Sequence, residues 1–439
     1  MAGSRSLRRT QRSWYVYDWA NSAFQTTVIT VFLGPFLTGL AQAAADAQGF
    51  VRPLGIPIRA VALYPYLISL SALLQVVAMP LVGALADRTG RRRLLLGVLA
   101  YTGALTTMLL YFVGERQYIV GSALFLIASV AFTCSIVVYN AWLPDIAPTE
   151  DRDAVSSRGW AVGYLGGGLL LAANLVLLQM VQGGRLPIDL ADAVRISIVS
   201  AGGWWALFTI VPLLGLDDAP PRAVAAGGGF RQLAHTLGRL RRAPATLTFL
   251  AAYLLFNDGV QTVISQSAVF ADQELLMPQD VIVIAVLTVQ LVAVAGALLL
   301  GWLAVRLGAK RVVLASLLVW VGVLAYAYVL PAQQVQAFYA LAVLIGLVLG
   351  GTQALARSLF SHMVPAGAEA EYFSAYEISD RGTSWLGALL FGVAVQITGS
   401  YRVAILSLVL FFVLGFLLLW IADIRRAAAE AGNAAPARL

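Results

Sequence analysis

Long apolar runs separated by short polar breaks make up almost the whole of this 439-residue chain. Each run holds about 20 residues or more, the length that an α-helix needs to cross the hydrocarbon core of a bilayer. The breaks contain charged residues, Gly or Pro. This pattern predicts an all-α polytopic membrane protein with twelve transmembrane helices, near residues 14–40, 61–86, 93–113, 117–143, 157–181, 195–216, 244–271, 280–305, 311–330, 333–362, 371–398 and 402–424.

The composition agrees with a chain that is solvated mainly by lipid. Hydrophobic residues make up 60% of it, charged residues only 12%, and the mean hydropathy is +0.82. A soluble domain carries about a quarter charged residues. So few charged groups leave too little polar surface to cover a soluble protein of this length.

Positive charge is distributed unequally between the two sides that alternating helices define. Of the 29 Lys and Arg residues, 21 fall in the segments on the side of the termini and six on the other, while Arg357 and Arg381 lie within helices. Cytoplasmic loops carry the excess of Lys and Arg, so both termini are expected in the cytoplasm and the protein in the cell membrane. The same distribution explains the net charge of +7 without a nucleic-acid partner.

The basic N-terminus, followed by an apolar stretch and an Ala-rich segment, also has features of a cleavable signal peptide. The apolar run is too long for a signal core, however, and it contains Asp18 and Asn21. We therefore expect this segment to remain as the first membrane helix.

The longest polar connection divides the helices six and six, and part of it has Phe230, Leu233, Leu237 and Leu240 at helical spacing. Either a basic amphipathic helix on the membrane surface or a solvated linker fits this spacing. The expected organisation is a cytoplasmic basic tail at 1–13, an N-terminal six-helix bundle at 14–216, a cytoplasmic linker at 217–243, a C-terminal six-helix bundle at 244–424 and a cytoplasmic tail at 425–439.

Motifs recur between the two halves, which indicates an internal repeat. GALADRTGRRR runs from Gly83 to Arg93, and GWLAVRLGAKR runs from Gly301 to Arg311, at an offset of 218 residues. Asp18 of the first expected helix and Asp258 of the seventh are separated by 240 residues. The offset is longer here because the first loop exceeds its counterpart in the second half by about 20 residues.

The segment GALADRTGRRR resembles the loop between the second and third helices of the major facilitator superfamily. This resemblance implies a glycine that lets two helices approach, an acid that caps or pairs near a helix end, and arginines that hold the loop among lipid headgroups. Val305 stands where the second copy would repeat the acid, which leaves the role of that charge open. The resemblance makes five residues candidates for a gate or latch: Gly83, Asp87, Arg88, Gly90 and Arg91.

A narrower resemblance extends over nearly the whole chain. YDWANSAF, YNAWLPDIA, SSRGWAVGYLGGG, FNDGVQTVI and GGTQALARSLFSHMVP, in this order, resemble the Atg22-like branch of the superfamily. The resemblance implies two pseudo-symmetric six-helix bundles, with the first and seventh helices lining a central cavity. It also implies efflux of amino acids, which is the role of the vacuolar members of that branch.

Polar side chains inside the expected helices are candidates for the substrate or ion path. An Asp at the bilayer centre costs about 2.5–3.5 kcal/mol, so such groups should face a cavity or a partner. If the Asp residues instead lie near helix ends, solvation or pairing with a loop explains them equally well. The path candidates are Asp18, Asn21, Asn140, Asn257, Asp258, Gln261, Gln353 and Arg357.

Charged residues around the fourth-to-fifth and tenth-to-eleventh loops are further latch candidates. Glu377 and Arg381 are four residues apart, in the order that favours pairing on a helix. Arg357 is either a counter-ion for a substrate carboxylate or a partner of Glu377. This group consists of Asp145, Arg158, Glu377, Asp380 and Arg381.

Several kinds of chemistry have no support in the residues. Two histidines and the single Cys134 provide neither a metal-ligand cluster nor an intrachain disulfide, so no metal and no cofactor are expected. The glycine clusters at 163–168 and 346–351 lack the strand and Lys of a phosphate loop, and predict close helix packing instead. An enzyme embedded in the membrane would need a convergent His, Ser or Lys set, which is lacking.

The sequence as a whole predicts a monomeric secondary active transporter that works by alternating access. By resemblance the substrate is a small organic solute, an amino acid, and the direction is efflux; coupling to protons is a further hypothesis. The alternatives are a transporter of lipid or lysophospholipid with the same fold and, more remotely, a membrane sensor that does not transport. The expected partners are the solute, membrane lipids and protons.

Overall fold

The computed structural model describes residues 2–146, 152–218, 243–364, 376 and 384–433. Within these ranges, eleven helices are long and apolar enough to cross a membrane. A shorter apolar helix, Trp385–Thr398, lies where the eleventh expected helix ends, and the start of that helix falls outside the described residues. The all-helical membrane fold predicted from the apolar pattern is therefore confirmed.

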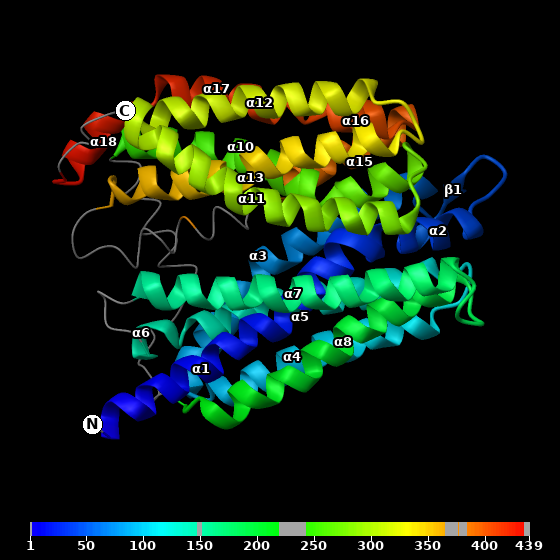
Figure 1. Cartoon of the computed structure of the whole chain (residues 1–439), viewed down its shortest axis with the longest axis horizontal. Coiled ribbons are helices and arrows are strands. Elements are labelled where there is room, and N and C mark those ends of the chain that lie inside the picture. The colour runs from blue at the N-terminus through cyan, green and yellow to red at the C-terminus, as the bar shows by residue number, and fades with distance from the viewer. Residues whose placement is uncertain (1, 147–151, 219–242, 365–375, 377–383, 434–439) are drawn as a thin grey trace. The chain divides into compact units, whose positions relative to one another are not determined.

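The chain forms two compact units, composed of Met1–Leu63 with Leu73–Gly229, and of Tyr64–Ala72 with Phe230–Leu439. The elements up to residue 215 are α1 (Ala2–Ala23), η1 (Phe24–Phe32), α2 (Leu33–Ala44), β1 (Phe50–Val51), η2 (Pro53–Gly55), β2 (Ile58–Arg59), η3 (Ala60–Ala62), α3 (Leu63–Thr89), α4 (Arg92–Leu109), η4 (Leu110–Phe112), α5 (Tyr118–Asn140), α6 (Leu143–Ile146), α7 (Arg152–Gln182) and α8 (Leu190–Gly215). Within the first unit α1 packs on α7 and α8, and α4 packs on α5 and α8 (Figure 1).

The second unit contains the remaining helices. These are α10 (Pro244–Gln273), α11 (Gln279–Leu307), α12 (Ala309–Val329), α13 (Val335–Ser361), α15 (Ser384–Thr398), α16 (Tyr401–Ser407), α17 (Val409–Ile421) and α18 (Ile424–Glu430). The main packing pairs in this unit are α11 with α13, α10 with α17 and α12 with α13. The last expected span is interrupted at Leu408, where α16 gives way to α17.

The first span is longer and less regular than the apolar pattern indicated. It begins as a helix at Ala2, and its middle section, Phe24–Phe32, is a π-helix. Thr30 Oγ1 donates a hydrogen bond to the carbonyl of Gln25 at 2.9 Å, a spacing of five residues that matches π geometry. Such wide turns occur often at functional sites of helices.

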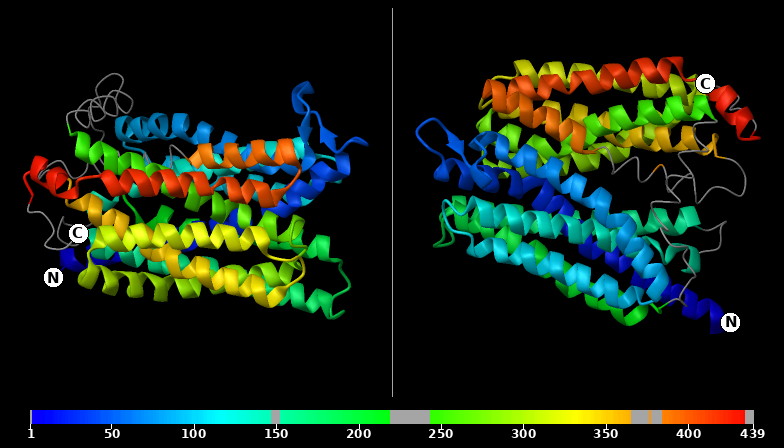
Figure 2. Two further views of the ribbon diagram at one scale, coloured as in Figure 1. Left: turned by 90° about the horizontal axis from the view of Figure 1, so that it is seen from above. Right: turned by 180° about the vertical axis from the view of Figure 1, so that it is seen from behind.

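A short hairpin follows α2. β1 and β2 are antiparallel, with Phe50 opposite Arg59, and the hairpin lies beyond the end of α2 (Figure 2). Leu54, in the turn, is 99% exposed and has a left-handed φ of 54°. A segment of this kind belongs outside the hydrocarbon region, where water satisfies its backbone.

The hairpin allows a test of membrane orientation, because Cys134 is buried and free and the wild-type protein should react little with a thiol reagent. We expect Leu54→Cys in intact cells to react with an impermeant maleimide. Arg425→Cys, exposed near the other end of the chain, should react only after the membrane is permeabilised. If Arg425→Cys reacted in intact cells and Leu54→Cys only after permeabilisation, the termini would lie outside the cytoplasm, contrary to the prediction from the Lys and Arg distribution.

Close helix packing depends on glycine at several points. A Cβ on Gly103 of α4 would lie 2.3 Å from the ring of the fully buried Trp205 of α8. In α7, a Cβ on Gly166 would lie 2.6 Å from the carbonyl oxygen of Trp19 in α1. Gly168, in contrast, faces open space. The cluster at 163–168 thus packs helices closely, as its composition predicted, although not through every member.

Candidate functional site

The signature loop turns on a glycine at the end of α3. Gly90 has a φ of 65°, and its N–H donates to the carbonyl of Ala86 at 3.0 Å. Gly308, 218 residues later, also has a positive φ, of 96°, and separates α11 from α12. Only glycine adopts such a conformation without strain, which explains why the repeat keeps it in both halves.

Arg92, the middle arginine of the RRR run at 91–93, is buried rather than exposed to lipid headgroups. It is 2% exposed, and its Nη1 donates to Asp145 Oδ2 at 2.6 Å and to the carbonyl of Ala141 at 2.9 Å. The bond joins α4 to the short helix α6. Sequence reasoning selected Asp145 as a latch residue but missed Arg92, because nothing in an RRR run shows which arginine turns inward.

Replacing Asp145 with Ala should lower the stability of the protein by about 1–2 kcal/mol, since it removes the carboxylate partner of a buried cation. The expected loss is smaller than for a fully buried pair, because the Asp145 side chain is 35% exposed. Thermal unfolding in detergent would measure the loss. The matched control is Glu430→Ala, which breaks the exposed pair with Arg426 on α18 and should change stability little. If the two substitutions lowered the melting temperature equally, burial of Arg92 would not make its ion pair more stabilising than an exposed one.

The other latch candidates have different surroundings. A Cβ on Gly83 would meet Val137 at 3.6 Å, an ordinary contact, so an alanine would fit at this position of the structure. Arg88 and Arg91 are exposed, as is Arg158 on α7. Asp87 lies on α3, but its side chain is not among those that the structure describes. Three further candidates lie outside the described residues: Glu377, Asp380 and Arg381.

In the first unit, Asp18 of α1 lies among aromatic rings and glycines. The hydroxyl of Tyr139 donates to its Oδ2 at 2.7 Å, and the Tyr139 ring stacks on Trp14 with centroids 4.3 Å apart. On the side of α7, a Cβ on Gly159 would lie 2.5 Å from Asp18 Oδ2, and one on Gly163 would lie 3.3 Å from Asp18 Cβ. The glycines thus leave room for the carboxylate between α1, α5 and α7.

In the second unit, Asp258 of α10 is 1% exposed. Its Oδ2 accepts a hydrogen bond from the backbone N–H of Gly387 on α15 at 2.8 Å, while Oδ1 has no hydrogen-bond partner in the described part of the chain. A Cβ on Gly387 would lie 3.0 Å from that Oδ1 and 2.3 Å from Thr262 Oγ1. A buried carboxylate oxygen without a donor is costly, which makes it available to a proton or a cationic ligand.

The two acids occupy corresponding places in the repeat. Asp18 and Ser22 face Gly163, just as Asp258 and Thr262 face Gly387. The offset of 240 residues that relates the acids also relates Ser22 to Thr262. The internal repeat therefore extends to the packing of a buried acid against a glycine.

Amide side chains extend the polar region of the second unit. Gln353 Nε2 of α13 donates to Asn257 Oδ1 of α10 at 3.3 Å, so two of the predicted path residues meet. Gln261 is half-buried, and Arg357 is exposed on the turn of α13 that follows Gln353. No group of three or more His, Cys, Asp or Glu among the described residues could hold a metal ion.

The first unit has fewer contacts between predicted path residues. Asn21 is buried near Asp18 on α1, whereas Asn140 is exposed at the end of α5. Gln25, which sequence reasoning missed, is also exposed although it lies inside the first span. Gln25 follows Asn21 by four residues, a spacing that places two side chains near one face of a helix. This spacing could have identified Gln25 as a path candidate from the sequence. An exposed amide inside the span, as at Gln25, is consistent with a polar surface there.

Comparisons with known proteins agree with these features. A family model described as "Vacuole effluxer Atg22 like" matches residues 6–432. The chain is similar to the uncharacterized MFS-type transporter YxiO of Bacillus subtilis, at 28% identity over 94% of this chain and 95% of that protein. It is also similar to autophagy-related protein 22-2 of Neosartorya fischeri, at 25% identity over 86% and 76%. Among solved structures, the nucleoside transporter NupG has the same fold, with a TM-score of 0.68, 13% identity and coverage of 94% and 100%.

Proposed function

Because the chain belongs to the Atg22-like family of major facilitator transporters, we propose that it exports an amino acid across the membrane by alternating access. Members of this class are transporters rather than enzymes. The description of the family model, "Vacuole effluxer Atg22 like", supports transport of a solute out of a compartment.

One observation supports an amino acid above other solutes: a buried carboxylate lies next to amides. Asp258 offers an oxygen without a partner to an ammonium group. Gln353 of α13, whose Nε2 donates to Asn257 Oδ1, has a second amide N–H that can donate to a carboxylate. An α-amino acid carries both charges, and charge-assisted hydrogen bonds to each are the strong kind.

The same carboxylate supports coupling to protons. Asp258 Oδ1 alternately binding a proton and the ammonium group of the solute would link the two fluxes, because one oxygen cannot hold both. Asp18 is less suited to this exchange, since among the described residues Asp258 has a buried carboxylate oxygen without a hydrogen-bond partner and Asp18 has none. We assign the coupling to the second unit for that reason.

Orientation and organisation complete the proposal. The distribution of Lys and Arg supports cytoplasmic termini and a place in the cell membrane. The helices before and after the linker at 217–243 would act as the two moving bundles of a monomer. Two carboxylate sites at equivalent positions of the repeat support this division.

Counterflow in liposomes tests the function. Purified protein is reconstituted in vesicles preloaded with the twenty amino acids, and each labelled amino acid is then supplied outside. Saturable accumulation of one chemical class, absent from protein-free vesicles, is the expected result. If folded protein accumulates none of them, the amino-acid assignment fails, and lysophospholipids and other organic solutes become the next substrates to test.

A further inference from the structure

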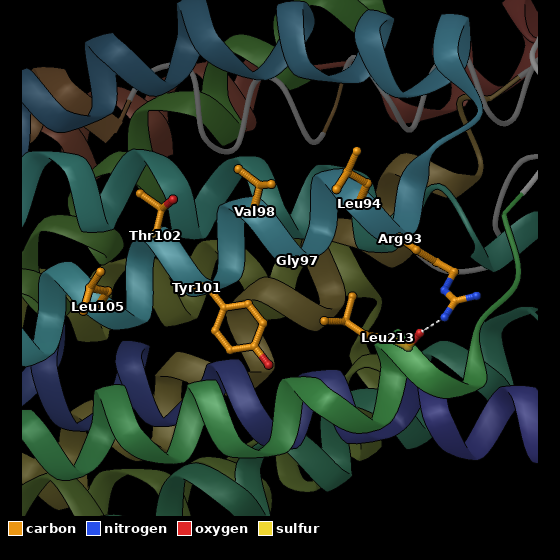
Figure 3. Close-up of a pocket in the computed structure, with 8 residues that line it drawn as sticks. All are labelled: Arg93, Leu94, Gly97, Val98, Tyr101, Thr102, Leu105 and Leu213. Carbon is orange, nitrogen blue, oxygen red and sulfur yellow. Dashed lines mark hydrogen bonds between the residues drawn. The ribbon is translucent and has the colours of Figure 1, made fainter.

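The hollow in the surface of the first unit, between α4 and α8, is lined mainly by apolar side chains, among them Leu94, Val98 and Leu105 (Figure 3). At its end Arg93 already donates to the carbonyl of Leu213. Polar groups without a hydrogen-bond partner among the described residues lie instead inside the second unit. One of them is the amide side chain of Gln266 on α10.

Gln266 is 0% exposed, and neither its oxygen nor its nitrogen has a hydrogen-bond partner in the described part of the chain. An amide side chain can accept two hydrogen bonds and donate two. Burying it without any of them is costly, and a water molecule can supply them only where there is room for it. Since Gln266 has no exposed surface, its amide is destabilising in this conformation and gains hydrogen bonds only in one that admits water.

Gln266 continues a polar face of α10 that begins at Asp258. Thr262 and Gln266 follow Asp258 at intervals of four residues, and all three side chains are buried. Asp258 and Thr262 face Gly387 of α15. Gln353, the amide assigned to the solute carboxylate, meets α10 from α13 instead. The buried polar face and the amide for the solute therefore lie toward different neighbours of α10.

Ionisable side chains are lacking on the two helices that pack most extensively on α10, because the sequences of α15 and α17 contain none. The remaining ionisable groups of α10 itself, of the other helices that pack on it and of the segment 64–72 beside α15 are Tyr253, Asp272, Asp280, Arg306, Tyr339, Arg357, Tyr401, Arg402, Arg425, Arg426, Glu430, Tyr64 and Tyr66. Arg402 pairs with Glu274, and Gln273 donates to Asp272. A proton that moves between α10 and α15 therefore needs water, held there by hydroxyl and amide groups.

The direction of α10 places Gln266 on the outer side of Asp258. With both termini in the cytoplasm, α10 runs outward, and eight residues at 1.5 Å each put Gln266 about 12 Å further out. We propose that the proton that drives export enters along this face, through water that Gln266 and Thr262 hold when α10 and α15 move apart. The proton then binds Asp258 Oδ1 as the ammonium group of the solute leaves. This route rests on the proton-coupled export proposed above.

Two substitutions separate polarity from packing at this position. Gln266→Met keeps the length of the side chain and removes the amide, so it should raise the melting temperature in detergent by roughly 2–4 °C and block the route. Gln266→Asn keeps an amide and shortens the side chain, so it should lower the melting temperature and leave the route open. Ser265→Ala is the control, since Ser265 Oγ donates within α10 to the carbonyl of Thr262 at 3.2 Å.

Transport is measured with a radiolabelled mixture of the twenty amino acids, in vesicles that also contain a pH-sensitive dye. Counterflow at equal pH exchanges solute for solute without a proton, so every variant should retain it. Efflux into acidic buffer without solute, and the acidification of the lumen that accompanies it, should fall roughly tenfold in Gln266→Met, the factor that corresponds to about one hydrogen bond. Both should persist in Gln266→Asn and Ser265→Ala.

Three results would overturn the route. Slower proton-driven efflux in Gln266→Asn than in Gln266→Met would show that packing matters at this position rather than the amide. A lower melting temperature of Gln266→Met would show that the amide already has partners. Equal loss of counterflow and of proton-driven efflux in Gln266→Met would assign the residue to the solute path.

The wild-type protein distinguishes failure of this route from failure of the proposed function. Counterflow without uptake of protons would exclude both the route and the coupling but keep the amino-acid assignment. Absence of counterflow in folded protein would reject the amino-acid assignment itself, and the route with it.

Discussion

Asp258→Asn is expected to slow solute transport roughly 10- to 150-fold, because a hydrogen bond to a charged group contributes about 1.5–3 kcal/mol. The substitution removes the negative charge but keeps the size of the side chain. Its amide oxygen still accepts the N–H of Gly387, so the packing of α10 against α15 should survive. The remaining transport should no longer depend on pH, since the group that exchanges a proton is gone.

Initial rates of counterflow between pH 5 and pH 8 would measure both effects. Asp272→Asn is the matched control: it lies on the same helix, where Gln273 donates to its carboxylate at 2.6 Å, and it should leave the rate near that of the wild type. Unchanged transport by Asp258→Asn would remove this carboxylate from the mechanism. Reduced transport that keeps its dependence on pH would leave it a role in binding only.

Gly296→Ala should destabilise the second unit by about 1–3 kcal/mol, the usual cost of extra volume in a packed interior. The new Cβ would lie 2.3 Å from the carbonyl oxygen of Leu347 and 2.8 Å from its Cα. Both are backbone atoms, so α11 and α13 would have to move apart. A flexible side chain could give way, but a helix backbone moves only as a whole.

Gly301→Ala is the control, since it lies on the same helix and its Cβ would meet nothing within 4 Å. It should leave stability unchanged or raise it by up to about 1 kcal/mol, because Ala favours a helix more than Gly does. Loss of helical circular dichroism on heating in detergent would report the unfolding of both variants. Equal melting temperatures for the two variants would show that α11 and α13 tolerate separation.

Most of the helices could be predicted from the chain alone. A backbone in lipid has to satisfy its hydrogen bonds within each span, so a long apolar run leaves the helix as its only solution. The positive φ of Gly90 and Gly308, which end α3 and α11, was not predicted from the sequence. What it missed was local, such as the π-helical stretch in the first span and the break at Leu408 in the last.

The candidate site was predicted as a set of residues but not as a set of contacts. The pattern of polar residues inside apolar runs selected Asp18, Asn21, Asn257 and Gln261. It could not show that Gln353 would reach Asn257, or that Arg92 rather than another arginine would turn inward to Asp145. Nor could it show that the backbone N–H of Gly387 would be the partner of Asp258.

There is a physical reason why the helices could be predicted from the sequence and the contacts of the site could not. A membrane helix forms through interactions between residues about four positions apart and through contact of its side chains with lipid. Both depend directly on the order of the side chains, so the helices and their repeat can be predicted from the sequence. The bonds of the site join residues far apart in the chain, 129 positions in the case of Asp258 and Gly387. They depend on which helices pack together and how closely glycine lets them approach, and that was decided only when the whole unit folded.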